Sequence, residues 1–189
     1  QETDFDWNYI PGATTKVLPD KVLQDKGGSS SGHRNFSDET FLTGVHASDK
    51  NAMFSFRMHD ITYDQSFRAN KSVFAFEGFL LCLGSDIQTK DKRYQTVTTL
   101  FQSFSRNTNE ERIPEGYILT DPSLMYAVKG GAVRTLCEGS HTRAYIEHGN
   151  APEAAKYHYY ILKKKNKALA RQLLSANSPI EIIAQDNDA

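Results

Sequence analysis

The chain has 189 residues, of which 39% are hydrophobic and 24% charged, and this composition is typical of a soluble globular domain with one substantial core. Its formal net charge of −1 excludes the global positive field that attracts a polyanion, so no nucleic acid partner is expected. No apolar run approaches the roughly 20 residues that cross a bilayer, so no membrane partner is expected either.

The first part of the chain is predicted to be irregular. Pro11-Gly12 and Pro19 interrupt regular structure, and the Gly- and Ser-rich residues 27–32 are typical of a flexible loop. We therefore expect residues 1–36 to be an irregular N-terminal segment that packs on a β-sandwich domain formed by residues 37–189. The chain starts at Gln1 without an initiator Met or a signal-peptide pattern, so we expect it to be a processed chain or a fragment of a larger enzyme.

A series of short strands follows this segment. Alternating or continuous apolar runs, separated by Gly, Asn, Asp and Ser turn signals, are typical of antiparallel sheets. The predicted strands cover residues 41–47, 52–59, 95–104, 116–120, 124–128, 132–138, 142–148, 156–163 and 180–184, with a hairpin over 71–87. Residues 105–112 are polar and are predicted to form a loop.

Two of these predictions carry extra information. Two apolar runs flank Glu77-Gly78, which predicts a tight turn inside a buried hairpin. In residues 156–163, one side of the predicted strand carries Tyr157 and Tyr159 and the other carries Tyr160 and Leu162. Because both faces are largely apolar, we expect this strand to lie at the centre of a sheet that is covered on both sides.

One helix is predicted, over residues 165–177. Leu169, Leu173 and Leu174 form its apolar stripe, and Ser178-Pro179 ends it. The predicted fold class is therefore mostly β: an antiparallel multi-stranded β-sandwich with one short helix near the C-terminus.

The residues offer no complete catalytic or metal-binding pattern. The six histidines and two cysteines show none of the short spacings that bind zinc, and no phosphate-binding loop follows a strand, so no metal site and no cofactor are expected. Cys82 sits in an apolar strand, so we expect a buried free thiol, with a disulfide to Cys137 as the alternative.

Four residues are candidates for binding a substrate: Trp7, Asn8, His33 and Arg34. An indole in a loop can stack on a sugar ring while Asn8 hydrogen-bonds hydroxyl groups, but Trp7 can equally fill the seam against a neighbouring domain. Lysine and arginine also gather at residues 163–171 and 90–93, where they either contact a polyanion or form ordinary solvated surface.

Three segments resemble those of a known family: residues 5–15 (FDWNYIPGATT), 71–87 (KSVFAFEGFLLCLGSDI) and 97–102 (VTTLFQ), with a weaker fourth at 34–37. In amino-acid sequence and in order they resemble segments of the chondroitin ABC lyase branch of polysaccharide lyase family 8, whose members cut chondroitin sulfate and hyaluronate. Members consist of a helical toroid, a central β-sandwich region and a smaller C-terminal β domain. This chain resembles the central region, in which case the toroid and the C-terminal domain are absent partners.

The resemblance implies cleavage by β-elimination. A base removes the C5 proton of a uronic acid, the uronate carboxylate is neutralised, and a general acid protonates the leaving oxygen. In the family the Tyr, His and Arg lie in the toroid and the carboxylate precedes the Asp-Trp-Asn stretch, so no residue of this chain is expected to be catalytic. The implied role is a non-catalytic domain that frames the cleft for an acidic polysaccharide, in a secreted or periplasmic enzyme without organic cofactor. The alternative is an autonomous carbohydrate-binding module.

Overall fold

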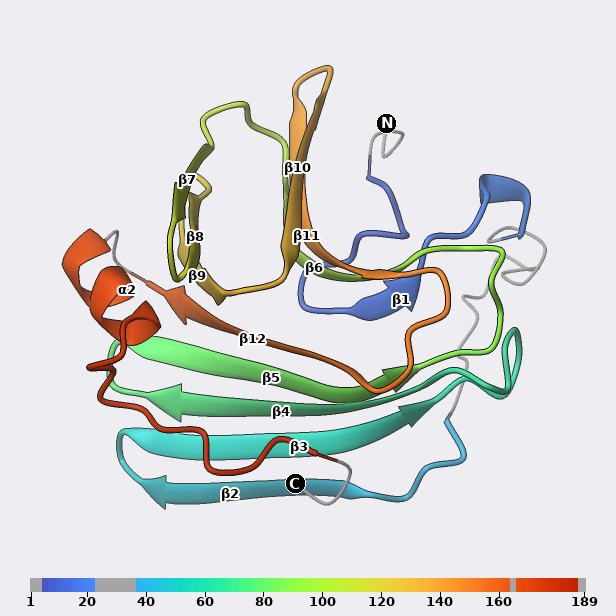
Figure 1. Cartoon of the computed structure of the whole chain (residues 1–189), viewed down its shortest axis with the longest axis horizontal. Helices are drawn as coiled ribbons and strands as arrows, with labels where there is room; N and C mark the ends of the chain where they lie inside the picture. Colours follow the sequence, from blue (N-terminus) through green and yellow to red (C-terminus); the bar gives the residue numbers. More distant parts are fainter. Residues whose placement is uncertain (1–4, 23–36, 164–165, 187–189) are drawn as a thin grey trace.

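The computed structural model describes residues 5–22, 37–163 and 166–186, which form an antiparallel two-sheet structure with a short helix near the C-terminus (Figure 1). The elements are β1 (Thr14–Lys16), β2 (Leu42–Ser48), β3 (Asn51–His59), β4 (Arg68–Phe76), β5 (Phe79–Gln88), β6 (Thr96–Ser103), β7 (Asn109–Ile113), β8 (Gly116–Thr120), β9 (Met125–Lys129), β10 (Ala132–Glu138), β11 (His141–Gly149), β12 (Ala155–Leu162) and α2 (Lys167–Leu174). An eight-stranded sheet has the order β2-β3-β4-β5-β12-β9-β8-β7, and a four-stranded sheet has the order β1-β6-β11-β10. The predicted fold class is confirmed.

The hairpin of β4 and β5 forms as predicted. Phe76 pairs with Phe79 across the turn, and Gly78 adopts a φ of 93°, which an L side chain rarely tolerates. The two strands then continue in register along the large sheet, interrupted by one bulge between Arg68 and Asn70.

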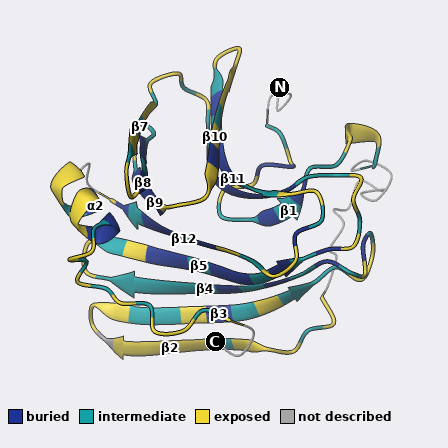
Figure 2. Cartoon of the chain, viewed as in Figure 1, coloured by how far each residue is buried: buried dark blue, intermediate teal, exposed yellow. Residues whose placement is uncertain are grey.

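Strand β12 occupies the central position that the sequence indicated. It pairs with β5 on one side and β9 on the other, although it follows both of them in the chain. Tyr157 and Tyr159 enter the core between the two sheets, whereas Tyr160 and Leu162 enter a second core on the opposite face. Figure 2 shows burial concentrated along β5, β12 and β9, while β2 at the edge is exposed.

The two cores have different partners. The core between the sheets joins the small sheet, through residues such as Leu100 and Ile146, to the large one. The second core lies under α2, whose Ala170, Leu173 and Leu174 are buried against the large sheet. The helix begins at Asn166, whose side chain accepts a hydrogen bond from Leu169 N at 3.1 Å.

Three local expectations were wrong. Thr14–Lys16, in the segment expected to be irregular, forms β1 and pairs with β6. Asn109–Ile113, expected to be a loop, forms β7 at the edge of the large sheet, where polar residues face solvent. Residues 180–184 are not a strand; Ile180 packs on the core under the helix and Ile183 is 93% exposed.

Buried charges attach the N-terminal segment to the large sheet. The Lys16 ammonium lies 2.8 Å from Asp64 Oδ2 and 2.5 Å from Asp91 Oδ2, and all three side chains are nearly buried. The Lys71 ammonium, also buried, donates to the Gly12 carbonyl. Cys82 is a buried free thiol as expected, and Cys137 is free and exposed. Among the described helical residues none forms a span long and apolar enough to cross a membrane.

Candidate functional site

The most distinctive surface lies on the outer face of the small sheet, where the N-terminal segment crosses β6 and β11. The strand register places Gln102 opposite Arg143. Gln102 Oε1 accepts from Asp6 N at 2.9 Å, and its Nε2 donates to the carbonyls of Asp6 and Tyr9 at 3.1 Å each. This one amide side chain therefore fixes residues 6–9 on the sheet.

Arg143 is the centre of the local electrostatics. Its guanidinium lies 3.0 Å from Asp6 Oδ2, 2.9 Å from Glu138 Oε2 and 4.5 Å from the centroid of the Tyr9 ring. Its buried Nε has no hydrogen-bond partner among the described residues. Two carboxylates thus surround one guanidinium, so the immediate surroundings of Arg143 carry no excess positive charge.

Large apolar side chains are exposed around this centre. Trp7 is 67% exposed and packs edge-on against Phe5, with 5.1 Å between the ring centroids. Phe104, 62% exposed, packs edge-on against His141 at 4.8 Å, and Ile10 is 41% exposed. Isolated exposed apolar residues are ordinary, but several exposed apolar side chains on one surface are typical of a contact with a partner domain or a ligand.

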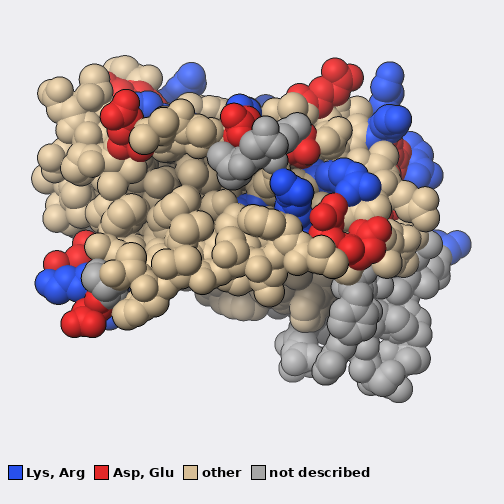
Figure 3. Space-filling view, turned by 90° about the horizontal axis from the view of Figure 1, so that it is seen from below, with Lys and Arg blue, Asp and Glu red and all other residues tan. Residues whose placement is uncertain are grey.

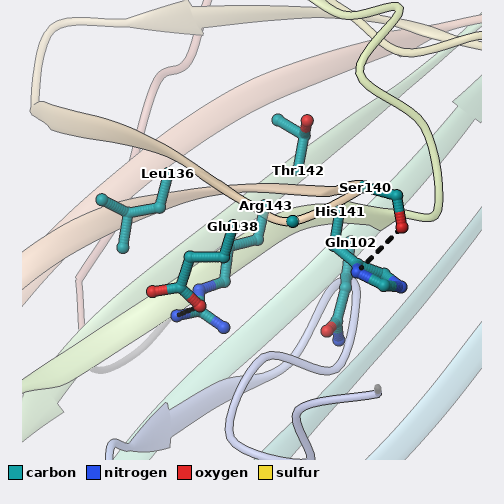
Figure 4. Close-up of a pocket in the computed structure, with 8 residues that line it drawn as sticks. Gln102, Leu136, Glu138, Ser140, His141, Thr142 and Arg143 are labelled. Carbon is teal, nitrogen blue, oxygen red and sulfur yellow. Dashed lines mark hydrogen bonds and ion pairs between the residues drawn. The ribbon is translucent and has the colours of Figure 1, made fainter.

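A pocket of about 370 Å³ opens beside Arg143 at the β10–β11 hairpin (Figure 4). It is lined by Gln102, Leu136, Glu138, Gly139, Ser140, His141, Thr142 and Arg143. Figure 4 shows the Glu138 carboxylate beside the Arg143 guanidinium and Ser140 beside the His141 ring, in keeping with their contacts at 2.9 and 3.4 Å. The lining is polar and small, suited to a few hydroxyl or carboxyl groups rather than to a bulky apolar ligand.

Tyr9 anchors this surface from beneath. It is buried with Val97 and Tyr145 in a small cluster of its own. Burial, with the neighbouring Tyr145, raises the pKa of Tyr9 to about 12, so its hydroxyl stays protonated at neutral pH.

The predicted binding residues fall into three situations. Trp7 is exposed on the surface just described. Asn8 is buried, and its carboxamide is used internally: Oδ1 accepts from Leu18 N at 2.8 Å and Nδ2 donates to Leu18 O at 2.9 Å. The structure therefore gives Asn8 a loop-closing role, and its contact with sugar hydroxyls stays a prediction. His33 and Arg34 lie outside the described residues.

A second group of side chains that can exchange protons lies between the sheets. His148 Nε2 lies 2.8 Å from Thr98 Oγ1, and the centroid of its ring lies 5.9 Å from that of the Tyr157 ring. Lys71 is close enough for its charge to affect the pKa of His148. Burial, followed by the Lys71 charge, lowers the pKa of His148 to about 4, and burial lowers the pKa of Lys71 to about 8. Tyr157 and Lys71 are only 6% and 7% exposed and His148 is half-buried, so a polymer cannot reach the tyrosine or the lysine.

Two described members of the basic run at residues 163–171 are engaged in ion pairs. Lys167 Nζ lies 3.2 Å from Glu111 Oε2, and Arg171 also contacts the Glu111 carboxylate. These two contacts hold α2 against β7, and contact of this run with a polyanion stays a prediction. Lys90 and Lys92 lie at the other end of the large sheet and line a separate groove.

Gln102, Phe104, His141 and Arg143 were not identified from the sequence. Each lies on, or just past the end of, a strand whose partner is far away in the chain, so only the pairing of β6 with β11 brings them together. Phe104, an apolar residue just past the end of a strand and followed by polar residues, was the one available signal. In the described part of the chain, no three His, Cys, Asp or Glu side chains are grouped to hold a metal ion.

Comparison with known proteins identifies relatives. A family model described as polysaccharide lyase family 8, super-sandwich domain, matches residues 3–118. The chondroitin sulfate ABC exolyase of Bacteroides thetaiotaomicron is 30% identical, over 86% of this chain and 18% of that protein. The chondroitin sulfate ABC exolyase and endolyase of Proteus vulgaris are 28% and 27% identical over 95% and 100% of this chain. The chain spans about a fifth of the length of these relatives, between 18% and 22%.

Solved structures show the same fold. The chondroitin AC lyase of Streptomyces coelicolor A3, solved with chondroitin sulphate, superposes with a TM-score of 0.78 at 21% identity, over 97% of this chain and 26% of that one. A Paenibacillus xanthan lyase superposes with a TM-score of 0.66 at 19% identity, over 96% of this chain and 20% of that one.

Proposed function

Because this chain belongs to polysaccharide lyase family 8, we propose that it is the non-catalytic central β-sandwich domain of a secreted or periplasmic glycosaminoglycan lyase. The parent enzyme cleaves chondroitin sulfate or hyaluronate by β-elimination. This domain frames one side of the substrate cleft and supports a helical toroid that carries the reacting groups.

One observation carries the proposal: the family match begins in the segment that forms the exposed aromatic surface. Trp7 and Ile10 project from a segment that Gln102 and Asn8 hold rigidly in place. A rigid exposed apolar surface on a folded core is typical of a contact with another domain or ligand.

The electrostatics of this surface support a domain contact. An acidic polysaccharide requires excess positive charge, whereas Arg143 is already shared between Asp6 and Glu138. A contact made by Trp7, Ile10 and Phe104 needs no such excess, because burial of apolar area stabilises it. The toroid is therefore the favoured partner of this surface, and the sugar is held mainly between the two domains.

The chemistry of elimination supports the absence of catalysis in this domain. The reaction needs a base, an acid and a group that neutralises the uronate carboxylate, all open to a polymer. Two described groups combine such side chains. In the first, His148 lies with Tyr157 and Lys71, and the tyrosine and the lysine are buried. In the second, at the open pocket, the Arg143 guanidinium that would neutralise a uronate is already paired with Asp6 and Glu138. The reacting groups are accordingly assigned to another domain of the parent.

The test has two arms. The chain alone, incubated with chondroitin sulfate, should produce no unsaturated uronate by ultraviolet absorbance. A chimera in which this chain replaces the matching segment of the Bacteroides thetaiotaomicron exolyase should retain measurable elimination, and Trp7→Ala in the chimera should lower it. Turnover by the chain alone would refute the proposal, as would a correctly folded chimera whose activity is insensitive to Trp7.

A carbohydrate-binding module is the second candidate, favoured by the 67% exposure of Trp7 beside Phe5. It requires that the chain alone bind chondroitin oligosaccharides and that Trp7→Ala abolish the binding. Equal affinity of the wild type and Trp7→Ala would exclude this candidate.

A further inference from the structure

A groove at the other end of the large sheet forms a second candidate binding site. It has a volume of about 790 Å³ and shares no lining residue with the pocket beside Arg143. Its walls are Gln65, Ser66, Arg68, Gln88, Thr89, Lys90, Lys92, Ala151, Pro152, Glu153 and Ala154. They come from the start of β4, the end of β5 and the segment before β12, which meet at one end of the molecule (Figure 1). The volume is in the range of small-molecule sites.

Positive charge dominates the lining. Three basic side chains, Arg68, Lys90 and Lys92, face one acidic one, Glu153. Arg68 is paired with Glu39 at 2.8 Å, but Lys90 and Lys92 are exposed and make no ion pair with any residue that the structure describes. Since the whole chain has a net charge of −1, this positive charge is a local property. Figure 3 shows charged side chains gathered towards this end of the face seen from below, while much of that face is uncharged.

The groove is built rigidly. Lys90 N donates to Ser66 Oγ at 2.8 Å, and Thr89 N donates to the Pro152 carbonyl at 3.1 Å. Asn150 Nδ2 donates to the Lys92 carbonyl at 3.1 Å. These bonds join all the groove's walls, so the lysines are presented from a fixed backbone and binding costs little ordering of the main chain.

The backbone around the groove departs from regular geometry in several places. Asp86 and Ala154, with φ of 49° and 54°, are the two described residues other than glycine with positive φ. Ala154 lines the groove, and the Asp86 side chain accepts from Gln88 Nε2 at 2.9 Å. Bulges interrupt the pairing of β5 with both β4 and β12 at this same end. Such departures concentrate where a chain must place side chains for binding.

We propose that this groove binds an anionic stretch of saccharide, with Lys90 and Lys92 pairing with its sulfate or carboxylate groups. The amides of Gln65 and Gln88 are placed to contact hydroxyl groups, and Ala151 and Pro152 form a small apolar floor for a sugar ring. The saccharide class rests on the proposed function, whereas the preference for anions rests on the groove itself. The site lets the domain hold a second stretch of the polymer, apart from the surface that carries Trp7.

The experiment titrates the full chain with a chondroitin 4-sulfate hexasaccharide by calorimetry, at low and at physiological salt. Binding should weaken with salt, because exposed charges are screened. The double variant Lys90→Ala/Lys92→Ala should bind at least tenfold more weakly. The matched control Lys156→Ala/Lys163→Ala removes the same charge from exposed positions outside the groove and should bind within twofold of the wild type. Amide chemical shifts should move at residues 65–68, 88–92, 151, 153 and 154.

Several results would overturn the groove: no binding by the wild type, equal binding by the Lys90/Lys92 variant, an equal loss in the control, or equal affinity for a neutral oligosaccharide. The chimera tests the proposed function independently of the groove. An inactive chimera with lysine-dependent binding would overturn the proposed function alone. An active chimera without such binding would overturn the groove alone.

Discussion

Gly84 and Tyr157 face each other across β5 and β12, and the tyrosine ring fills the space that a side chain at Gly84 would occupy. A β-carbon added to Gly84 would lie 2.0 Å from Cε1 of that ring. The close approach lets the tyrosine enter the core between the sheets, where it lies 5.9 Å from His148.

Gly84→Ala should therefore destabilise the fold although alanine suits a strand better than glycine. The added methyl group forces the ring out of place, and such overpacking costs about 1–3 kcal/mol. Gly44→Ala is the matched control, because its added β-carbon would meet no atom closer than 3.5 Å on an edge strand. Urea unfolding measures both variants, and an equal free energy of unfolding for the two would contradict the packing described.

Lys16→Met should be among the most damaging single substitutions. It removes the cation that Asp64 and Asp91 share and leaves two nearly buried carboxylates without it, a change that typically costs about 3–5 kcal/mol. Lys50→Met removes a similar pair with Glu77 whose side chains are 62% and 72% exposed, and should cost less than about 1 kcal/mol. Urea unfolding midpoints of the two variants measure both losses of stability. Equal losses would contradict the buried ion-pair network around Lys16.

His148 should make the protein sensitive to acid. Its pKa is lowered from 6.5 to about 4, first by burial and then by Lys71, so the unfolded chain takes up a proton before the folded chain does. The full stability is present above pH 6.5, the pKa of His148 in the unfolded chain. It is lost as the pH falls towards the folded-state pKa of about 4, and the loss amounts to about 3 kcal/mol. His148→Gln removes this proton uptake, so the difference in unfolding free energy between it and the wild type should shrink by that amount on acidification. A difference that does not change with pH would show that His148 is not held neutral.

Asn8→Ala should reduce stability by about 1–3 kcal/mol, because it leaves the half-buried Leu18 amide and carbonyl without their partner. Asn177→Ala, at an exposed position, is the control and should change stability by less than about 0.5 kcal/mol. Below its unfolding temperature, the Asn8 variant should bind chondroitin oligosaccharide as the wild type does. A loss of affinity in a fully folded Asn8→Ala chain would instead support direct contact with sugar.

Strands with strong periodicity could be predicted from the sequence. The alternation in β12 places tyrosines on both faces, and only a central strand between two layers can bury both. Glu77-Gly78 marked the hairpin because the φ of Gly78 disfavours other residues. The residues at 109–113 were missed because an edge strand buries little, so its sequence need not alternate.

The candidate surface was only partly predictable. Trp7 stood out as the single tryptophan, but its neighbour Asn8 turned inwards because the backbone of Leu18, ten residues later, offers it a donor and an acceptor. Arg143 and Gln102 are 41 positions apart, and nothing local in either strand indicates that they meet. Sheet pairing, which is non-local, determines the site, whereas sequence periodicity reports only on local geometry.

The position of β12 has a consequence for synthesis on the ribosome. β2 to β5 and β7 to β9 are made as two separate antiparallel groups, and the strand that joins them spans residues 155–162. A growing chain therefore carries two unfinished edges, at β5 and at β9, until that late segment emerges and inserts between them. Such exposed edges invite premature association, so a nascent chain of this domain is expected to depend on chaperones that shield them during translation.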